Sequence, residues 1–146
     1  MTQRIKHEIT KFKPDSAHKK IAILDDEKYV TTTFRTILES GLISRGEIAF
    51  KFIIYTSNDP AQFLDVFEPG FCDLLLIDIN MPGMDGFEVS RRLLEVDLNL
   101  RICFMTAGEI NYRALREIHS VRSVGCYITK PISANDLINK VRMELE

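Results

Sequence analysis

The residues of this 146-residue chain that could do chemistry are carboxylates placed directly after runs of apolar residues. Asp78 follows the apolar run 74–77, and Asp25 and Asp26 follow the run 21–24. A continuous apolar run of this length is typical of a strand buried on both faces. A charged group at the tip of such a strand loses hydration unless cations or hydrogen-bond donors meet it there. Asp78 is therefore expected to have partners.

Two further polar residues occupy the same kind of position. Thr106 ends the run 102–105, and Lys130 follows the run 126–129. If these strands lie parallel in one sheet, their carboxyl ends meet at the same edge. Two carboxylates ~5 Å apart repel each other by roughly 3 kcal/mol at an effective dielectric constant of ~20, so three of them together require a cation.

The three aspartates predict a Mg²⁺ site. Oxygen-only ligands select a hard divalent ion, and a site with few protein oxygens suits Mg²⁺ better than Ca²⁺. A metal, the ammonium of Lys130 and the hydroxyl of Thr106 together make a receptor for a phosphoryl group, and Asp78 can be its acceptor.

The elements that must position these residues alternate between strands and helices. Strands are predicted at residues 20–25, 50–56, 73–79, 101–106 and 126–129, and helices at 29–40, from Asp59-Pro60, from Asp85, at 111–120 and from Ser133. Such alternation is typical of β-α units on a parallel sheet. We expect an α/β fold, namely a flavodoxin-like three-layer sandwich with a doubly wound five-stranded parallel sheet of order 2-1-3-4-5.

Composition limits the class of protein. Hydrophobic residues make up 45% of the chain, charged residues 27%, and the net charge is -2, so no general attraction to nucleic acid or to a membrane is expected. Residues 1–20 carry six basic and two acidic residues. We interpret residues 1–18 as a flexible basic extension and residues 19–146 as the domain. The sequence shows neither a secretion signal nor a membrane span, which favours a cytoplasmic protein.

The cysteines do not predict a cross-link or a metal site. Cys72, Cys103 and Cys126 are odd in number, and none forms a C-x-x-C pair. Each is expected to pack as a small apolar side chain.

Four segments, in order, resemble the receiver domain of two-component response regulators. They are Leu24-Asp25-Asp26-Glu27, the block of residues 77–86, Met105-Thr106-Ala107, and the block of residues 127–131 that ends in Lys130-Pro131. The resemblance extends from about Lys19 to the C-terminus.

The resemblance implies a role for each acidic residue. Asp78 would be the phosphoacceptor, attacking the phosphohistidine of a partner kinase. Asp25, Asp26 and Asp78 would hold Mg²⁺ together with the backbone carbonyl of Asn80. Such a protein catalyses only its own phosphorylation and dephosphorylation, and is not otherwise an enzyme.

The resemblance also implies a conformational switch. Lys130 would pair with a phosphoryl oxygen, Thr106 would move to donate to another, and Tyr127 would follow inward. The Lys130-Pro131 bond would be cis. Cys126 departs from the pattern, because this family often has glycine before the switch aromatic residue.

Partners follow from the same resemblance. A histidine kinase or a phosphotransfer protein would supply the phosphoryl group, and an unknown separate target protein would read the switch. A docking surface is expected around Arg113, Arg116, Arg122 and Tyr127.

Alternative readings remain for these residues. Asp25 and Asp26 could simply cap a helix, and Tyr127 could be a core residue. The domain could be a pseudo-receiver that binds partners without phosphorylation. A phosphatase of the haloacid dehalogenase type would need a second aspartate where the chain has Asn80, and a dinucleotide-binding enzyme would need a glycine-rich turn after the first strand.

Overall fold

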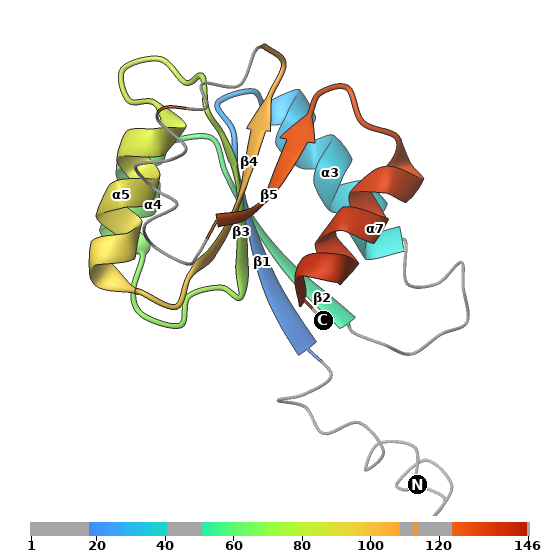
Figure 1. The fold of residues 1–146 in the computed structure, drawn as a ribbon, viewed down its shortest axis with the longest axis horizontal. Coiled ribbons are helices and arrows are strands. Elements are labelled where there is room, and N and C mark those ends of the chain that lie inside the picture. The colour runs from blue at the N-terminus through green and yellow to red at the C-terminus, as the bar shows by residue number, and fades with distance from the viewer. Residues whose placement is uncertain (1–17, 41–50, 109–112, 114–123, 146) are drawn as a thin grey trace, which may run out of the picture.

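A parallel sheet forms the centre of the molecule in the computed structural model, which describes residues 18–40, 51–108, 113 and 124–145 (Figure 1). Its strands are β1 (His18–Leu24), β2 (Lys51–Ser57), β3 (Leu74–Asp78), β4 (Arg101–Thr106) and β5 (Val124–Thr129). Every neighbouring pair is parallel, and the order is β2-β1-β3-β4-β5. The predicted fold class and strand order are confirmed.

Helices cover both faces of the sheet. They are α3 (Lys28–Ser40), α4 (Pro60–Val66), α5 (Gly86–Val96) and α7 (Ala134–Leu145). Figure 1 shows α4 and α5 on one side of the sheet and α3 and α7 on the other. The helix predicted at 111–120 lies outside the described residues except for residue 113, and so do residues 1–17 of the predicted extension. Among the helices described, none combines the length and the apolar character that a membrane crossing requires.

The predicted helix starts are confirmed by their caps. The Asp59 carboxylate accepts hydrogen bonds from the first-turn amides of α4, and Pro60 occupies the first position of that helix. The Asp85 carboxylate accepts from the Glu88 amide at 2.8 Å. The Ser133 hydroxyl accepts from the Asp136 amide at 3.1 Å. These caps satisfy amide groups that have no partner inside the helix.

Two apolar cores lie on the two faces of the sheet. Along β1, β3 and β4 successive side chains alternate between them, which explains why these strands are apolar throughout. One core packs under α4 and α5 and includes Phe63, Val89 and Phe104. The other packs under α3 and α7 and includes Phe34, Leu38 and Val141. By contrast, β2 lies at an edge of the sheet and alternates between buried and exposed residues.

The prediction for two of the three cysteines is wrong. Cys103 and Cys126 form a disulfide, with their Cα atoms 4.5 Å apart. Cys72 is the free cysteine and is buried, as expected. The prediction considered only the spacing of cysteines along the sequence. The pairing of β4 with β5 places Cys103 and Cys126, which are 23 positions apart, opposite each other.

Candidate functional site

Asp25 is the first residue after β1 and is fully buried. Its amide donates to the backbone oxygen of Ser57, the last residue of β2, at 3.2 Å. This hydrogen bond ties the end of β1 to the end of β2. One carboxylate oxygen, Oδ1, accepts from the Glu27 amide at 2.9 Å. Because Glu27 precedes α3, this bond closes a turn in front of the helix and does not cap its first-turn amides. The other oxygen, Oδ2, contacts Lys130 and points to a second role.

Asp78 is the last residue of β3, next to β1 in the sheet. The amide of the following residue, Ile79, donates to the backbone oxygen of Met105 at 2.9 Å, so the chain beyond Asp78 is held against β4. Asp25, Asp26 and Asp78 each offer one carboxylate oxygen, and these three oxygens lie within 4.8 Å of one another. The predicted convergence of the three aspartates at the switch point of the sheet is what the structure has.

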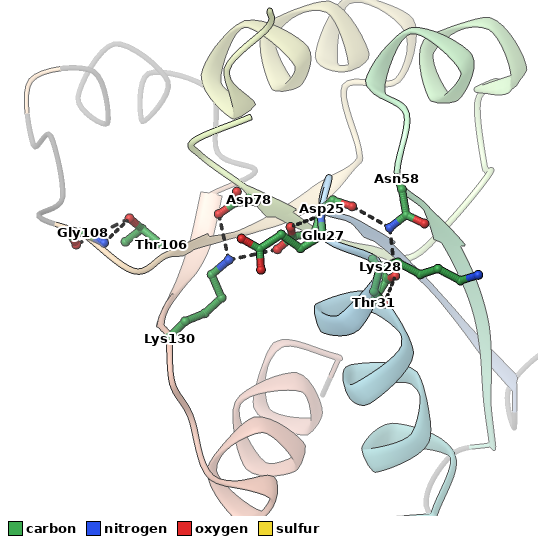
Figure 2. A network of polar contacts seen from close by, with 9 residues as sticks. All are labelled: Asp25, Glu27, Lys28, Thr31, Asn58, Asp78, Thr106, Gly108 and Lys130. Carbon is green, nitrogen blue, oxygen red and sulfur yellow. Dashed lines mark hydrogen bonds and ion pairs between the residues drawn. The ribbon is translucent and has the colours of Figure 1, made fainter. Parts of the chain in front are cut away.

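The Lys130 ammonium lies between two of these carboxylates. Its Nζ atom is 3.0 Å from Asp25 Oδ2 and 3.2 Å from Asp78 Oδ1 (Figure 2). The Lys130 amide donates to the backbone oxygen of Thr106 at 2.8 Å, which extends the ladder between β4 and β5 to the base of the lysine. The peptide bond that follows, Lys130-Pro131, is cis, as the resemblance implied.

Burial and neighbouring charges alter the acidity of this cluster. Burial raises the pKa of Asp78 above its ordinary value, the Asp25 carboxylate raises it further, and the Lys130 ammonium opposes the rise. Burial alone would lower the pKa of Lys130, but its contacts with Asp25 and Asp78 outweigh that effect and raise it. Lys130 therefore stays protonated, but its single positive charge does not balance the negative charge of the three aspartates.

The donor set fits a hard divalent cation. Three ionised carboxylates and one ammonium leave two negative charges, which one Mg²⁺ ion would neutralise. Asp25, Asp26 and Asp78 supply only oxygen ligands, without sulfur or nitrogen, as Mg²⁺ prefers. That the backbone carbonyl of Asn80 is a further metal ligand stays a prediction.

Thr106 is the last residue of β4, and Tyr127 lies on the neighbouring strand β5. The Thr106 hydroxyl accepts from the Gly108 amide at 3.0 Å, and Figure 2 shows the two residues side by side. Tyr127 is half-buried against the core under α4 and α5. Their roles in a switch stay predictions. Of the expected docking surface, Arg113 is exposed, whereas Arg116 and Arg122 lie outside the described residues.

The sequence reasoning missed Asn58, which supports Asp25. Its side-chain amide donates to the backbone oxygen of Asp25 at 2.8 Å and to the Thr31 hydroxyl at 3.0 Å (Figure 2). Asn58 directly follows β2, so the rule that polar residues at strand ends share one edge could have found it.

Gly86 was also missed as a positioning residue. A side chain there would overlap the backbone carbonyl of Asp78 and come within 3.0 Å of Ile79 Cα. The Gly86 amide donates to the backbone oxygen of Ile79 at 2.8 Å. The start of α5 therefore packs directly on the end of β3, which only glycine permits.

The fold and the site together define a doubly wound α/β protein with an acidic, lysine-paired centre at its switch point. Residues 21–142 match the model of the response regulator receiver domain, and the chain belongs to this family. Members of the family are phosphorylated on an aspartate in two-component signalling.

Two curated relatives differ in length. The chain is 32% identical over 117 residues to the cyclic di-GMP phosphodiesterase response regulator RpfG of Xanthomonas campestris pv. campestris (strain 8004), covering 80% of this chain but only 29% of that protein. It is 28% identical over 130 residues to sporulation initiation phosphotransferase F of Bacillus subtilis (strain 168), covering 88% of this chain and 94% of that protein. Similarity to RpfG thus concerns less than a third of that protein.

Solved structures share the fold. A CheY-like receiver domain from Methanospirillum hungatei JF-1 is 23% identical, with a TM-score of 0.69 over 87% of this chain and 93% of that one. The non-phosphorylated HemR receiver domain from Leptospira biflexa is 16% identical, with a TM-score of 0.72 over 88% of this chain and 94% of that one.

Proposed function

We propose that this chain is a response regulator that accepts a phosphoryl group on Asp78 from a histidine kinase or a phosphotransfer protein. The observation that carries the proposal is the placement of Asp78 at the end of a buried strand, 3.2 Å from the Lys130 ammonium, with carboxylate oxygens of Asp25 and Asp26 close by. The partly exposed carboxylate of Glu88 also has cations beside it, but unlike Asp78 it is not buried and belongs to no described cluster of three carboxylates.

The proposed reaction is a nucleophilic displacement at phosphorus. A carboxylate oxygen of Asp78 attacks the phosphorus atom, the bond from phosphorus to the histidine nitrogen breaks, and its electron pair returns to the imidazole. The product is an acyl phosphate on Asp78. Lys130 holds the carboxylate in place and donates to a phosphoryl oxygen, because its ammonium already lies at the reacting group.

Metal binding supports the same step. Asp25, Asp26 and Asp78 would hold Mg²⁺, with the Asn80 carbonyl as a further ligand. When bound, the ion would offset the charge of both the incoming phosphoryl group and the carboxylates. This chain's own contribution is to keep the aspartates together by anchoring Asp25 to Glu27, Ser57 and Asn58.

The output step uses Thr106 and Tyr127. Phosphorylation adds about 1.5 to 2 negative charges at neutral pH. The Thr106 hydroxyl, which now accepts from the Gly108 amide, would turn to donate to a phosphoryl oxygen. Tyr127, half-buried on the neighbouring strand, would then move inward into the space that is vacated. The changed surface near Tyr127 is what a target would recognise.

A separate target is our proposal for the partner. A relative of which this chain covers 94% is named a phosphotransferase, and we propose that this chain likewise acts on another protein, in the cytoplasm. The chain would then have no enzymatic activity beyond its own phosphorylation and dephosphorylation. RpfG is named both a phosphodiesterase and a response regulator, and illustrates a different use of a receiver domain.

Intact-mass spectrometry tests this proposal. Wild-type protein, Asp78→Asn and the control Asp65→Asn are treated with acetyl phosphate and Mg²⁺. Asp65 is an exposed aspartate of α4. One phosphate adduct is expected on wild type and on the control, and none on Asp78→Asn or after chelation. Absence of an adduct on wild type would favour the pseudo-receiver, and turnover of many small phosphoesters would favour the phosphatase.

A further inference from the structure

The disulfide between Cys103 and Cys126 joins neighbouring strands at one level of the sheet. The two residues are register partners in the β4-β5 pair, and their Cα atoms are 4.5 Å apart. Both belong to the apolar core under α3 and α7. The acidic site uses neither cysteine, so the proposed phosphoryl chemistry does not explain the pair.

The cross-link lies directly before the residues of the proposed switch. Phe104 and Tyr127, which follow the two cysteines, are the next register partners, and both contribute to the core on the opposite face. Beyond them Thr106 pairs with Thr129. A bond at the cysteines therefore fixes the separation of the two strands that carry both switch residues.

The strand pairing is irregular at this point. Ile102 pairs with Val124, whereas Cys103 pairs with Cys126, so the register shifts between Ile102 and Cys103. A shift of this kind interrupts the hydrogen-bond ladder locally. Moreover, β5 lies at the edge of the sheet and has a strand neighbour on one side only. The cross-link secures the place where β5 would otherwise separate from β4 most easily.

We propose that Cys103 and Cys126 form a reversible redox modification site, whose oxidation restrains β5 and weakens the response of the switch to phosphorylation. The proposal rests on the proposed function, and in particular on action in the cytoplasm. In reducing compartments disulfides are usually transient, catalytic or redox-sensing rather than permanent supports. The reactants are low-molecular-weight thiols and disulfides of the glutathione type.

The reaction is thiol-disulfide exchange. The thiolate of one cysteine attacks a sulfur of glutathione disulfide, forms a mixed disulfide and releases one glutathione thiolate. The second cysteine, as its thiolate, attacks the protein sulfur of that mixed disulfide and releases a second glutathione. Two protein thiols are thereby oxidised and one glutathione disulfide is reduced, with the two protons passing to the released thiolates. Reduced glutathione drives the reverse reaction.

Access to the pair is through the edge strand. Cys103 is fully buried, whereas Cys126 is slightly exposed and lies on β5. We therefore assign Cys126 as the first sulfur to react, after local opening of the edge. Cys72 cannot substitute for it, because Cys72 belongs to the core on the opposite face of the sheet, and burial raises its pKa to about 12.

Counting alkylated thiols tests the redox site. The protein is equilibrated in buffers of increasing glutathione disulfide, quenched, unfolded and alkylated. The expected count falls reversibly from three to one, because the chain has three cysteines and only Cys72 is free in the oxidised form. A count that stays at three, or a count that stays at one in excess reduced glutathione, would overturn the proposal.

Hydrogen exchange tests the coupling to the switch. Amide exchange of residues 124–129 is measured with and without the phosphate adduct, in reduced and oxidised wild type, in Cys126→Ala and in the control Cys72→Ala. Oxidation is expected to slow exchange in this segment on the order of tenfold and to diminish its response to phosphorylation. Cys72→Ala should keep this dependence on oxidation, and Cys126→Ala should lose it. An equal response in both redox forms of wild type would overturn the coupling.

Failure of the proposed function would look different. The thiol count requires no phosphate, and the adduct is measured by mass in each redox form. Absence of the adduct in both forms counts against phosphoryl acceptance, whereas a reversible change in the thiol count would still support the redox site.

Discussion

The Lys130 ammonium nitrogen lies 3.2 Å from a carboxylate oxygen of Asp78. Asp78 ends the central strand β3 and Lys130 follows the edge strand β5, with β4 between these two strands. Their contact needs the parallel register in which Ile79 and Lys130 donate to the backbone of β4. The sheet topology therefore makes a site in which one cation serves buried carboxylates that repel one another.

Asp78→Asn is expected to stabilise the metal-free protein at neutral pH. Burial and the Asp25 charge raise the pKa of Asp78, so its ionised form costs folding free energy. For an acid with a raised folded pKa this cost is present above the folded pKa, and it disappears as pH falls below the ordinary value of 3.8. Thermal melts in EDTA across this pH range should show a gain that vanishes in acid. A loss of melting temperature at neutral pH would contradict the crowded-carboxylate account.

Lys130→Met should destabilise the metal-free protein by roughly 3 kcal/mol, because it leaves the buried carboxylates of Asp25 and Asp78 without their cation. Since the pKa of Lys130 is raised, its stabilising contribution is fully present below its ordinary 10.5 while its carboxylate partners are ionised. It is lost as pH rises through the raised pKa of Lys130, and it also falls in acid as the Asp78 carboxylate is protonated. Urea unfolding measures the loss, and Lys51→Met, at an exposed position of β2, is the matched control. Millimolar Mg²⁺ should recover part of the loss. A variant as stable as the control would show that the ion pair does not hold the cluster.

Gly86→Ala should cost about 1 to 3 kcal/mol and slow phosphorylation by acetyl phosphate. The added methyl group overlaps the backbone carbonyl of Asp78, so either α5 or the end of β3 must move. Gly108→Ala is the control, because a Cβ there lies 3.8 Å from the Thr106 hydroxyl oxygen, an ordinary contact. Equal stability and equal rates in the two variants would refute the close-packing argument.

Asn58→Ala should destabilise the protein by about 1 kcal/mol, because the Asp25 backbone oxygen and the Thr31 hydroxyl lose a donor. A double-mutant cycle with Thr31→Val separates the two bonds: the effect of Asn58→Ala should be smaller when the hydroxyl is already absent. Mg²⁺ affinity should also fall, since Asn58 anchors the chain at Asp25. Strict additivity of the two substitutions would mean that the Asn58-Thr31 bond contributes nothing.

Much of this architecture was predictable from strand ends. The apolar runs before Asp25 and Asp78 identified buried parallel strands, and the rule that such strands meet at their carboxyl ends placed the aspartates together before any geometry was known. Lys130 was predictable for the same reason. The helix N-caps at Asp59, Asp85 and Ser133 were also predictable from the sequence, because capping depends on a few consecutive residues.

The rest depended on contacts between distant segments. The Cys103-Cys126 bond follows from the register of β4 against β5, which no sequence spacing gives. Gly86 matters because of where α5 begins relative to β3, and Asn58 because of which strand end its side chain meets. Each depends on the packing of two elements, whereas the sequence pattern describes one element at a time.

The most direct test of phosphoryl acceptance is to locate the phosphate. Wild-type protein treated with acetyl phosphate and Mg²⁺ is reduced with borohydride, which converts an acyl phosphate of aspartate to homoserine, and is then digested and sequenced by mass spectrometry. We predict homoserine at position 78, and none there when Mg²⁺ is chelated. Homoserine at Asp25 or Asp26 instead, or at no position, would contradict the account.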